Sequence, residues 1–293
     1  MRHFKIFIEL TRLNKPIGFM LLFWPCSWGM AYAYVGNQNT NLFMYYLLLF
    51  FLGSILMRSA GCIFNDIVDK NYDKKVKRTK RRPIAAGRIS INRSLTYVAI
   101  LCVLAFLILI QFNLKTILLG LGSMFLAFSY PFMKRITYWP QLFLGITFNW
   151  GLIMAWTAMG NSISLNITIL YFSAIFWTLG YDTIYGTQDI SDDEIIGLKS
   201  TAIKFKNNLK KFVTMSYLIT IVTLIYLFSN TFKESYNPMP FNRRKLSSSN
   251  DIAFEENSVS DFDSITSVLR LYWLHTFAHI CPISPKPTIA TSY

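Results

Sequence analysis

Seven long apolar stretches constrain the fold of this chain more than any other feature of its sequence. Each is roughly 18–23 residues long, enough for a helix to cross about 30 Å of hydrocarbon. One or two such runs could be buried core helices, but seven in series are typical of an integral membrane protein. We therefore predict an all-α, multi-span transmembrane helical bundle. The expected spans are residues 17–35, 42–64, 94–112, 116–133, 141–159, 165–186 and 211–229.

The positive charge lies in alternate connections between these spans. The net charge is +14, which could suggest a nucleic-acid partner. However, Lys and Arg gather at the N-terminus and in residues 66–93, 134–140 and 187–211, whereas residues 36–41, 111–114 and 160–164 carry no charge. This alternation follows the positive-inside rule. It predicts a multi-pass protein of a bacterial or mitochondrial inner membrane, with the N-terminus and both long loops on the cytoplasmic side, and no nucleic-acid partner.

Two acidic clusters begin where two of the predicted spans end. The first has the pattern NDxxDxxxD and consists of Asn65, Asp66, Asp69 and Asp73; the second consists of Asp182, Asp189, Asp192 and Asp193. Offsets of three and four residues place carboxylates on one helical face, where like charges repel each other. Lysines of the same loops could neutralise them. Two facing sets of hard oxygen ligands favour Mg²⁺ more, because Mg²⁺ binds one or two carboxylates together with phosphate oxygens and water.

A basic run, VKRTKRRP at residues 76–83, follows the first acidic cluster. Lys77, Arg78 and Arg82 could donate to a polyanion, since arginine forks match phosphate oxygens. The alternative is a topology anchor, which we prefer for the remaining basic residues of this loop. Together the clusters predict a site where metal ions and basic side chains bind a diphosphate, while the apolar spans hold its hydrophobic chain.

Four segments of the sequence carry a resemblance to a known family. They are RLNKPIGFMLLFWPCSW (12–28), MRSAGCIFNDIVDKNYDKKVKRTKRRPIAAGRIS (57–90), YPFMKRITYWPQLFLG (130–145) and YDTIYGTQDISDDEIIGLKSTAIKF (181–205). Residues 5–230 resemble the UbiA superfamily of membrane aromatic prenyltransferases. The KPIG and GLKSTA segments are most similar to its branch that prenylates 4-hydroxybenzoate in ubiquinone biosynthesis.

This resemblance implies a reaction. Two Mg²⁺ ions would bind a polyprenyl diphosphate between the Asp-rich loops, and the C–O bond would ionise to an allylic cation. The ring carbon ortho to the hydroxyl of 4-hydroxybenzoate would then attack that cation. Metal ions neutralise charge on the leaving diphosphate, and a lipid-embedded site excludes water. The expected partners are polyprenyl diphosphate, 4-hydroxybenzoate and membrane lipid.

The resemblance also implies roles for individual residues. The expected metal ligands are Asn65, Asp66, Asp69, Asp73, Asp189 and Asp193, of which the aspartates are also the expected catalytic residues. The expected diphosphate ligands are Lys77, Arg78, Arg82, Lys134 and Lys199. The expected acceptor-binding residues are Arg12, Arg58, Asp182 and Tyr185.

Arg58 is the only basic residue away from the ends of a predicted span, and a buried arginine needs an anionic partner. That partner is either the acceptor carboxylate or a nearby aspartate. Aromatic rings can stabilise a cation, and the candidates for this role are Trp24, Phe148, Trp150 and Tyr185. In a chain this aromatic, packing is the alternative role for each of them.

The sequence departs from the family after residue 229. Members of the family usually have about nine spans, whereas residues 230–293 contain no clean apolar stretch of span length. We therefore predict a membrane domain at 1–229 and a divergent polar tail at 230–293 that is disordered or poorly packed. The alternatives to the expected activity are an inactive homologue that retains the motifs, a prenyltransferase with another aromatic acceptor, and a transporter. Transporters tend to place charge near the bilayer midplane, so acidic clusters at span ends favour the enzyme.

Overall fold

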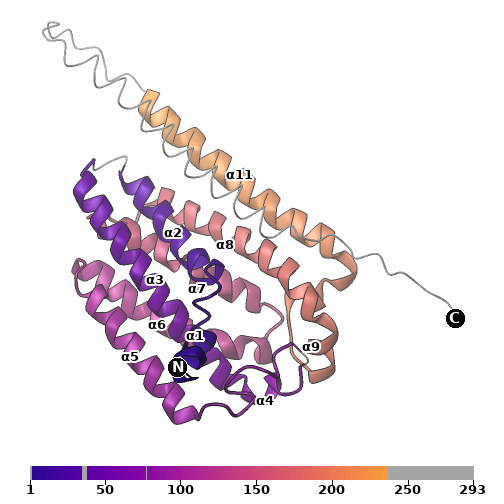
Figure 1. Ribbon diagram of the computed structural model, residues 1–293. Coiled ribbons are helices and arrows are strands. Elements are labelled where there is room, and N and C mark those ends of the chain that lie inside the picture. Colours follow the sequence, from indigo (N-terminus) through magenta and orange to yellow (C-terminus); the bar gives the residue numbers. More distant parts are fainter. Residues whose placement is uncertain (1, 35–37, 77, 237–293) are drawn as a thin grey trace, which may run out of the picture. The chain divides into compact units, whose positions relative to one another are not determined.

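The computed structural model describes residues 2–34, 38–76 and 78–236, in which every regular element is a helix (Figure 1). The chain divides into two compact units, Met1–Asn237 and Pro238–Tyr293, and the described helices belong to the first. The last described helix continues to Tyr236, beyond the end of the expected span at 229. The remainder of the predicted polar tail lies outside the described residues.

Long helices form at all seven of the predicted spans. They are α2 (Ile17–Tyr34), α3 (Thr40–Val68), α5 (Ile91–Leu109), α6 (Leu114–Ile136), α7 (Pro140–Ala158), α8 (Leu165–Gly186) and α11 (Leu209–Tyr236). Among the described residues, five segments are long and apolar enough to cross a membrane: Thr40–Val68, Ile91–Leu109, Leu114–Ile136, Leu165–Ile196 and Lys206–Ser229. The chain is thus a multi-span membrane protein by helix length and composition. The helices α2 and α7 fall outside this set, and they carry Trp, Pro, Gln and Asn among their apolar residues.

Shorter helices precede or connect the long ones along the chain. They are α1 (Arg2–Thr11), α4 (Lys70–Asp73), α9 (Ile190–Ile196) and α10 (Thr201–Lys204), with 3₁₀ turns η1 (Thr187–Asp189) and η2 (Lys206–Asn208). The α9 helix ends at Gly197, whose φ of 76° is the left-handed conformation that favours glycine at a helix C-terminus. Of the acidic residues, α4 contains Asp73, η1 contains Asp189 and α9 contains Asp193.

Side-chain caps fix where several long helices begin. Asn39 accepts a hydrogen bond from the Leu42 N–H at the start of α3, and Asn113 accepts one from the Thr116 N–H at the start of α6. Such caps satisfy N–H groups that have no partner within the helix. They set the helix ends at the loops, so that the apolar residues between them are available for the hydrocarbon.

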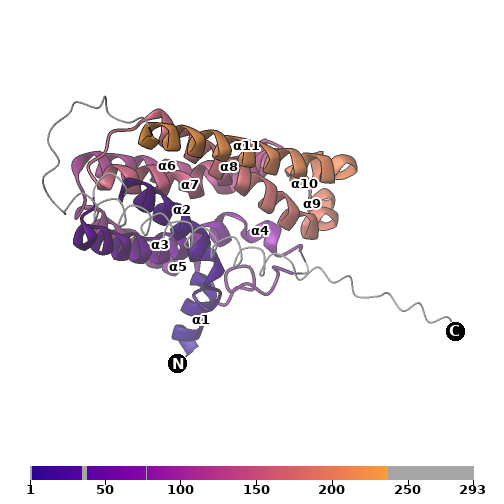
Figure 2. The ribbon, with the colours of Figure 1, turned by 90° about the horizontal axis from the view of Figure 1, so that it is seen from above.

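The helices pack in pairs along the bundle. The α2 helix contacts α3 and α7, α5 contacts α3, and α8 contacts α7 and α11; Figures 1 and 2 both show α11 lying along α8. The contact between α2 and α7 is especially close. A Cβ atom at Gly29 would lie 2.2 Å from the Leu152 carbonyl oxygen, and one at Gly151 would lie 2.4 Å from Cys26 Sγ. Small residues thus let the two backbones approach, as in other membrane helix pairs.

The two acidic loops lie at the same end of the bundle. Figures 1 and 2 show α4, which follows α3, and α9, which follows α8, at that end. The α3 helix is longer than the predicted span because it continues through Asp66 to Val68. The first carboxylates therefore stand on the last turn of a long helix, and their position is set by its packing.

Candidate functional site

The aspartates of the first cluster are buried at the end of α3. Asp66, Asp69 and Asp73 are 2%, 9% and 7% exposed. Asp66 lies in the last turn of α3, Asp69 at the junction with α4, and Asp73 in α4 itself. Taking carboxylates out of water is costly unless cations neutralise them. Their neighbours must therefore supply positive charge.

Two arginines from different segments neutralise Asp66 and Asp73. Arg12 Nη2 donates to Asp66 Oδ1 at 2.7 Å. Arg82 Nη1 bridges the two acids, at 3.1 Å from Asp66 Oδ1 and 2.8 Å from Asp73 Oδ2. Arg12 also has a φ of 56° directly after α1, a left-handed conformation that costs a non-glycine residue about 1–2 kcal/mol. This turn lets its guanidinium reach Asp66.

Arg135 holds the third carboxylate, and the sequence prediction missed it. Its Nη2 donates to Asp69 Oδ1 at 3.0 Å and to the Val68 carbonyl oxygen at 2.9 Å, and its guanidinium lies over the Tyr72 ring at 4.8 Å. Burial raises the pKa of the Asp69 carboxyl, against the opposing attraction of Lys134 and the hydrogen bond from Arg135. The only sequence signal was its place beside Lys134 in YPFMKR.

An ion pair joins the first acidic loop to the second. Arg78 Nε donates to Asp189 Oδ1 at 3.0 Å and Arg78 Nη2 donates to Asp189 Oδ2 at 2.7 Å, although the residues are 111 positions apart. Burial opposes the charge of Arg78, but the hydrogen bond with Asp189 and the attraction of this carboxylate raise the pKa of its guanidinium. The structure therefore brings the two acidic loops together.

Lys134, near the end of α6, lies between the clusters. It is close enough to Asp69 of the first cluster and Asp193 of the second to attract both. Its carbonyl oxygen also accepts a hydrogen bond from the Lys199 N–H at 2.8 Å, which ties the loop after α9 to the end of α6. Lys199 itself is directed elsewhere, because its ammonium donates to the Ile136 carbonyl oxygen at 3.2 Å.

The expected acceptor residues fall into two groups. Arg58 lies on α3 eight positions before Asp66, roughly two helical turns away, and its guanidinium is 5.3 Å from the centre of the Phe148 ring. Asp182 on α8 is near enough to attract it. Tyr185, which is 53% exposed, instead lies near the arginines of the acidic clusters.

Arg58 differs from the other arginines of the site in having no carboxylate partner among the described residues. Among the described residues, no carboxylate lies within ion-pair distance of its guanidinium, and its buried Nε has no hydrogen-bond partner. Arg12, the other candidate for the acceptor carboxylate, is already paired with Asp66. The charge of Arg58 is thus less neutralised than the charge of Arg12.

The remaining candidates are placed as follows. Lys77 lies outside the described residues. Asn65 sits in the last turn of α3, where its carbonyl oxygen accepts the Asp69 N–H at 2.9 Å. The Trp150 indole N–H donates to the Leu119 carbonyl oxygen at 3.0 Å, which gives that ring a packing role between α7 and α6. Trp24 packs beside the Phe23 ring in α2.

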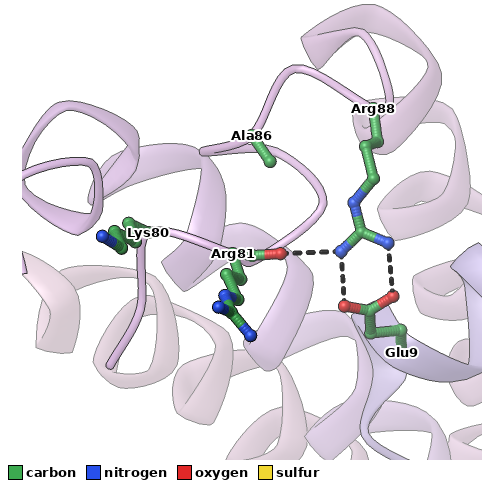
Figure 3. A pocket seen from close by; sticks show the side chains of 5 residues that line it. All are labelled: Glu9, Lys80, Arg81, Ala86 and Arg88. Atoms are coloured by element: carbon green, nitrogen blue, oxygen red, sulfur yellow. Dashed lines mark hydrogen bonds and ion pairs between the residues drawn. The ribbon is translucent and has the colours of Figure 1, made fainter. Parts of the chain in front are cut away.

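A surface pocket lies beside this site and contains none of its carboxylates (Figure 3). It is lined by Glu9, Lys80, Arg81, Ala86 and Arg88. Arg88 donates to both carboxylate oxygens of Glu9 and to the Arg81 carbonyl oxygen, so it ties α1 to the basic loop. These side chains are exposed, and we assign the pocket no part in the chemistry.

The donor set of the two clusters fits Mg²⁺ bound together with a phosphorylated ligand. Within the described residues, no three His, Cys, Asp or Glu side chains converge as a closed metal site. Mg²⁺ does not require such a site, because it takes one or two carboxylates and completes its octahedron with phosphate oxygens and water. The buried carboxylates would supply the hard oxygen ligands, and the arginines beside them suit a polyanion.

The fold and the site define a class: a helical membrane protein whose paired aspartate loops meet basic side chains at one end of the bundle. The chain belongs to the UbiA prenyltransferase family, whose sequence model matches residues 22–237.

Several mitochondrial proteins named 4-hydroxybenzoate polyprenyltransferase are similar to the chain. The Bos taurus protein is 49% identical over 209 residues, which are 71% of this chain and 56% of that protein. The Homo sapiens protein is 48% identical over the same shares. The Caenorhabditis elegans protein is 43% identical over 221 residues, 75% of this chain and 62% of that protein. The chain thus spans little more than half the length of these curated relatives.

Solved structures share the fold. An apo UbiA homologue from Aeropyrum pernix K1 matches with a TM-score of 0.60 and 22% identity, over 89% of this chain and 90% of that one. A UbiA homologue from Archaeoglobus fulgidus, solved with GPP and Mg²⁺, matches with a TM-score of 0.59 and 16% identity, over 90% of this chain and 99% of that one. At these identities the likeness concerns the fold alone.

Proposed function

We propose that this chain transfers a polyprenyl group from a polyprenyl diphosphate to the ring carbon ortho to the hydroxyl of 4-hydroxybenzoate, as a Mg²⁺-dependent step of ubiquinone biosynthesis. The observation that carries the proposal is the Arg78–Asp189 pair, because it brings both acidic loops to one site. The relatives that share nearly half of their aligned residues with this chain bear the name of this activity.

The diphosphate would bind between the acidic loops. When bound, Mg²⁺ would neutralise the charge that develops on the leaving diphosphate. Asp66, Asp69 and Asp73 of the first loop, with Asn65, and Asp189 and Asp193 of the second would hold the metal ions. Arg78, Arg82 and Lys134 would donate to the remaining phosphate oxygens, since each already lies against these carboxylates. Lys77 and Lys199 remain proposed diphosphate ligands.

The reaction breaks one bond and forms another. The C–O bond of the allylic diphosphate breaks, and its electron pair leaves with the diphosphate. The ring carbon ortho to the phenol hydroxyl then forms the new C–C bond and loses its proton. Asp182 would accept that proton, and its nearness to Arg58 supports this role. The surrounding apolar helices would keep water from the cation.

The acceptor carboxylate would bind Arg58 rather than Arg12. Arg12 is held by Asp66 at 2.7 Å, whereas Arg58 pairs with no carboxylate among the described residues. Phe148 lies against the same guanidinium and would border the acceptor ring. Tyr185 would stand nearer the diphosphate, since it lies by Arg12 and Arg78.

The protein would work in an inner membrane, with its acidic loops on the cytoplasmic side. The alternation of basic and uncharged connections supports this orientation. We infer a membrane domain at residues 1–229 and a polar tail at 230–293, although α11 continues to Tyr236.

A transfer assay tests the proposed function. Membranes that contain the protein receive radiolabelled 4-hydroxybenzoate, a polyprenyl diphosphate and Mg²⁺. Label should enter the lipid phase, and EDTA or Asp66→Ala should abolish this transfer. Glu9→Ala is the matched control, because Glu9 is an acid of the surface pocket that lies outside the acidic clusters. If a stably inserted protein transfers no label under these conditions, the proposal is wrong.

A further inference from the structure

Arg58 occupies a tight position between three helices. It stands on α3, with the Phe148 ring of α7 on one side and Gly18 of α2 on another. Charged groups inside membrane spans are expensive, and they are usually kept for function. The position of this guanidinium therefore depends on how much space the neighbouring helices leave for it.

Gly18, in the first turn of α2, leaves that space. A Cβ atom at Gly18 would lie 3.0 Å from Arg58 Nε, 3.6 Å from Arg58 Nη2 and 3.8 Å from Arg58 Cγ. A methyl group at 3.0 Å is closer than normal van der Waals contact, so the guanidinium would have to shift by a few tenths of an ångström. Moving the guanidinium would also move the N–H groups that a carboxylate would bind.

The backbone gives no separate reason for glycine at this position. Gly18 lies within a helix and has no left-handed φ, in contrast to Gly87, Gly160 and Gly197. The contact with Arg58 is therefore the feature that a side chain at position 18 would disturb.

We propose that Gly18 is a positioning residue that sets where the Arg58 guanidinium lies, and that it thereby selects acceptors that carry a carboxylate. This inference rests on the proposed function. It extends that function by naming a determinant of acceptor choice on α2, a helix that carries none of the metal or diphosphate residues. Gly18 acts through Arg58 and not on the reacting atoms.

The test compares two acceptors that differ only in charge, 4-hydroxybenzoate and its methyl ester. Losing part of a charged hydrogen bond weakens binding by roughly tenfold. Gly18→Ala should therefore raise the KM for 4-hydroxybenzoate about tenfold, with little change in kcat and no change in the KM for the ester. Gly53→Ala is the matched control, because Gly53 is on the same helix as Arg58 and a Cβ there meets nothing within 4 Å.

A double-mutant cycle separates positioning from a general effect on the fold. Lysine has no Nε–H group at the position that the methyl group would meet, so Gly18→Ala should have little further effect in an Arg58→Lys background. Additive effects of the two changes would overturn the proposal. An equal rise in KM for the acid and the ester would also overturn it.

Equilibrium binding keeps this inference distinct from the proposed function. If the wild-type protein transfers no prenyl group, the proposed function fails, and binding of the acid and the ester to the purified protein still decides the role of Gly18. Weaker binding of the acid alone to Gly18→Ala supports the role. Equal binding of the acid to both proteins refutes it.

Discussion

Arg78 and Asp189 form a two-point ion pair, with contacts of 3.0 and 2.7 Å, across 111 positions of the chain. Arg78 belongs to the loop after α3 and Asp189 to the turn after α8. Planar guanidinium groups match both oxygens of a carboxylate, so the pair fixes the direction as well as the distance of the contact. The pair therefore holds the two acidic loops next to each other.

The geometry predicts different responses to lysine at two arginines. Arg78 uses two nitrogens on two oxygens, whereas Arg82 bridges Asp66 and Asp73 through Nη1 alone. A lysine ammonium can replace one nitrogen but not a fork. We expect Arg78→Lys to raise the KM for the prenyl diphosphate about tenfold and Arg82→Lys to raise it less. Steady-state kinetics on purified protein measure both, and the reverse order would contradict this reading of the contacts.

A second prediction concerns stability. Arg82 is 20% exposed and neutralises two buried acids, whereas Arg88 is 38% exposed and pairs with Glu9, which is 46% exposed. Surface pairs contribute about 0–1 kcal/mol, and removing one partner of a buried pair costs several times more. Thermal unfolding in detergent should show a clearly lower melting temperature for Arg82→Ala and almost no change for Arg88→Ala. If both variants lost the same stability, burial would not explain the difference between the two ion pairs.

The sequence was sufficient to predict the helices and the acidic clusters, because both are local patterns. Apolar runs of membrane length located seven long helices, and spacing placed Asp66, Asp69 and Asp73 together. The length of α3 was underestimated, since the prediction ended with the apolar run at residue 64. The helix continues through polar residues, where Arg12 and Arg82 pair with Asp66.

The counter-ions could not be predicted in the same way. Arg135 and Lys134 are adjacent in sequence and equal in charge, and only the packing of α6 decides that Arg135 contacts Asp69. The direction of Lys199 toward a backbone carbonyl likewise depends on how its loop meets α6. The φ of Arg12 and the space that Gly18 leaves for Arg58 are tertiary features without a sequence pattern.

A third prediction tests the close contact between α2 and α7. A Cβ atom at Gly29 would lie 2.2 Å from the Leu152 carbonyl oxygen, which is backbone and cannot rotate away. Gly29→Ala should therefore destabilise the protein by about 1–3 kcal/mol through overpacking. Thermal unfolding measures this loss, and Gly53→Ala provides the control at an open position. A Gly29→Ala protein as stable as wild type would contradict the packing of these helices.

A fourth prediction concerns orientation. Single cysteines at Lys80 and Ser162, both exposed, can be introduced into a chain whose native cysteines are replaced. In sealed vesicles of known sidedness, a membrane-impermeant thiol reagent should label these two positions from opposite sides. Position 80 should react from the side that the positive-inside rule assigns to basic loops. Labelling of both positions from one side would contradict the proposed topology.

The central claim is that both acidic loops bind one diphosphate through divalent cations. Equilibrium binding of a non-reactive prenyl diphosphate analogue, measured with and without Mg²⁺, tests it most directly. Asp66→Asn and Asp189→Asn should each remove most of the Mg²⁺-dependent binding, and the double variant should lose little more, because both acids hold the same ligand. Glu9→Ala should bind like wild type. Undiminished Mg²⁺-dependent binding in either single aspartate variant would contradict the claim.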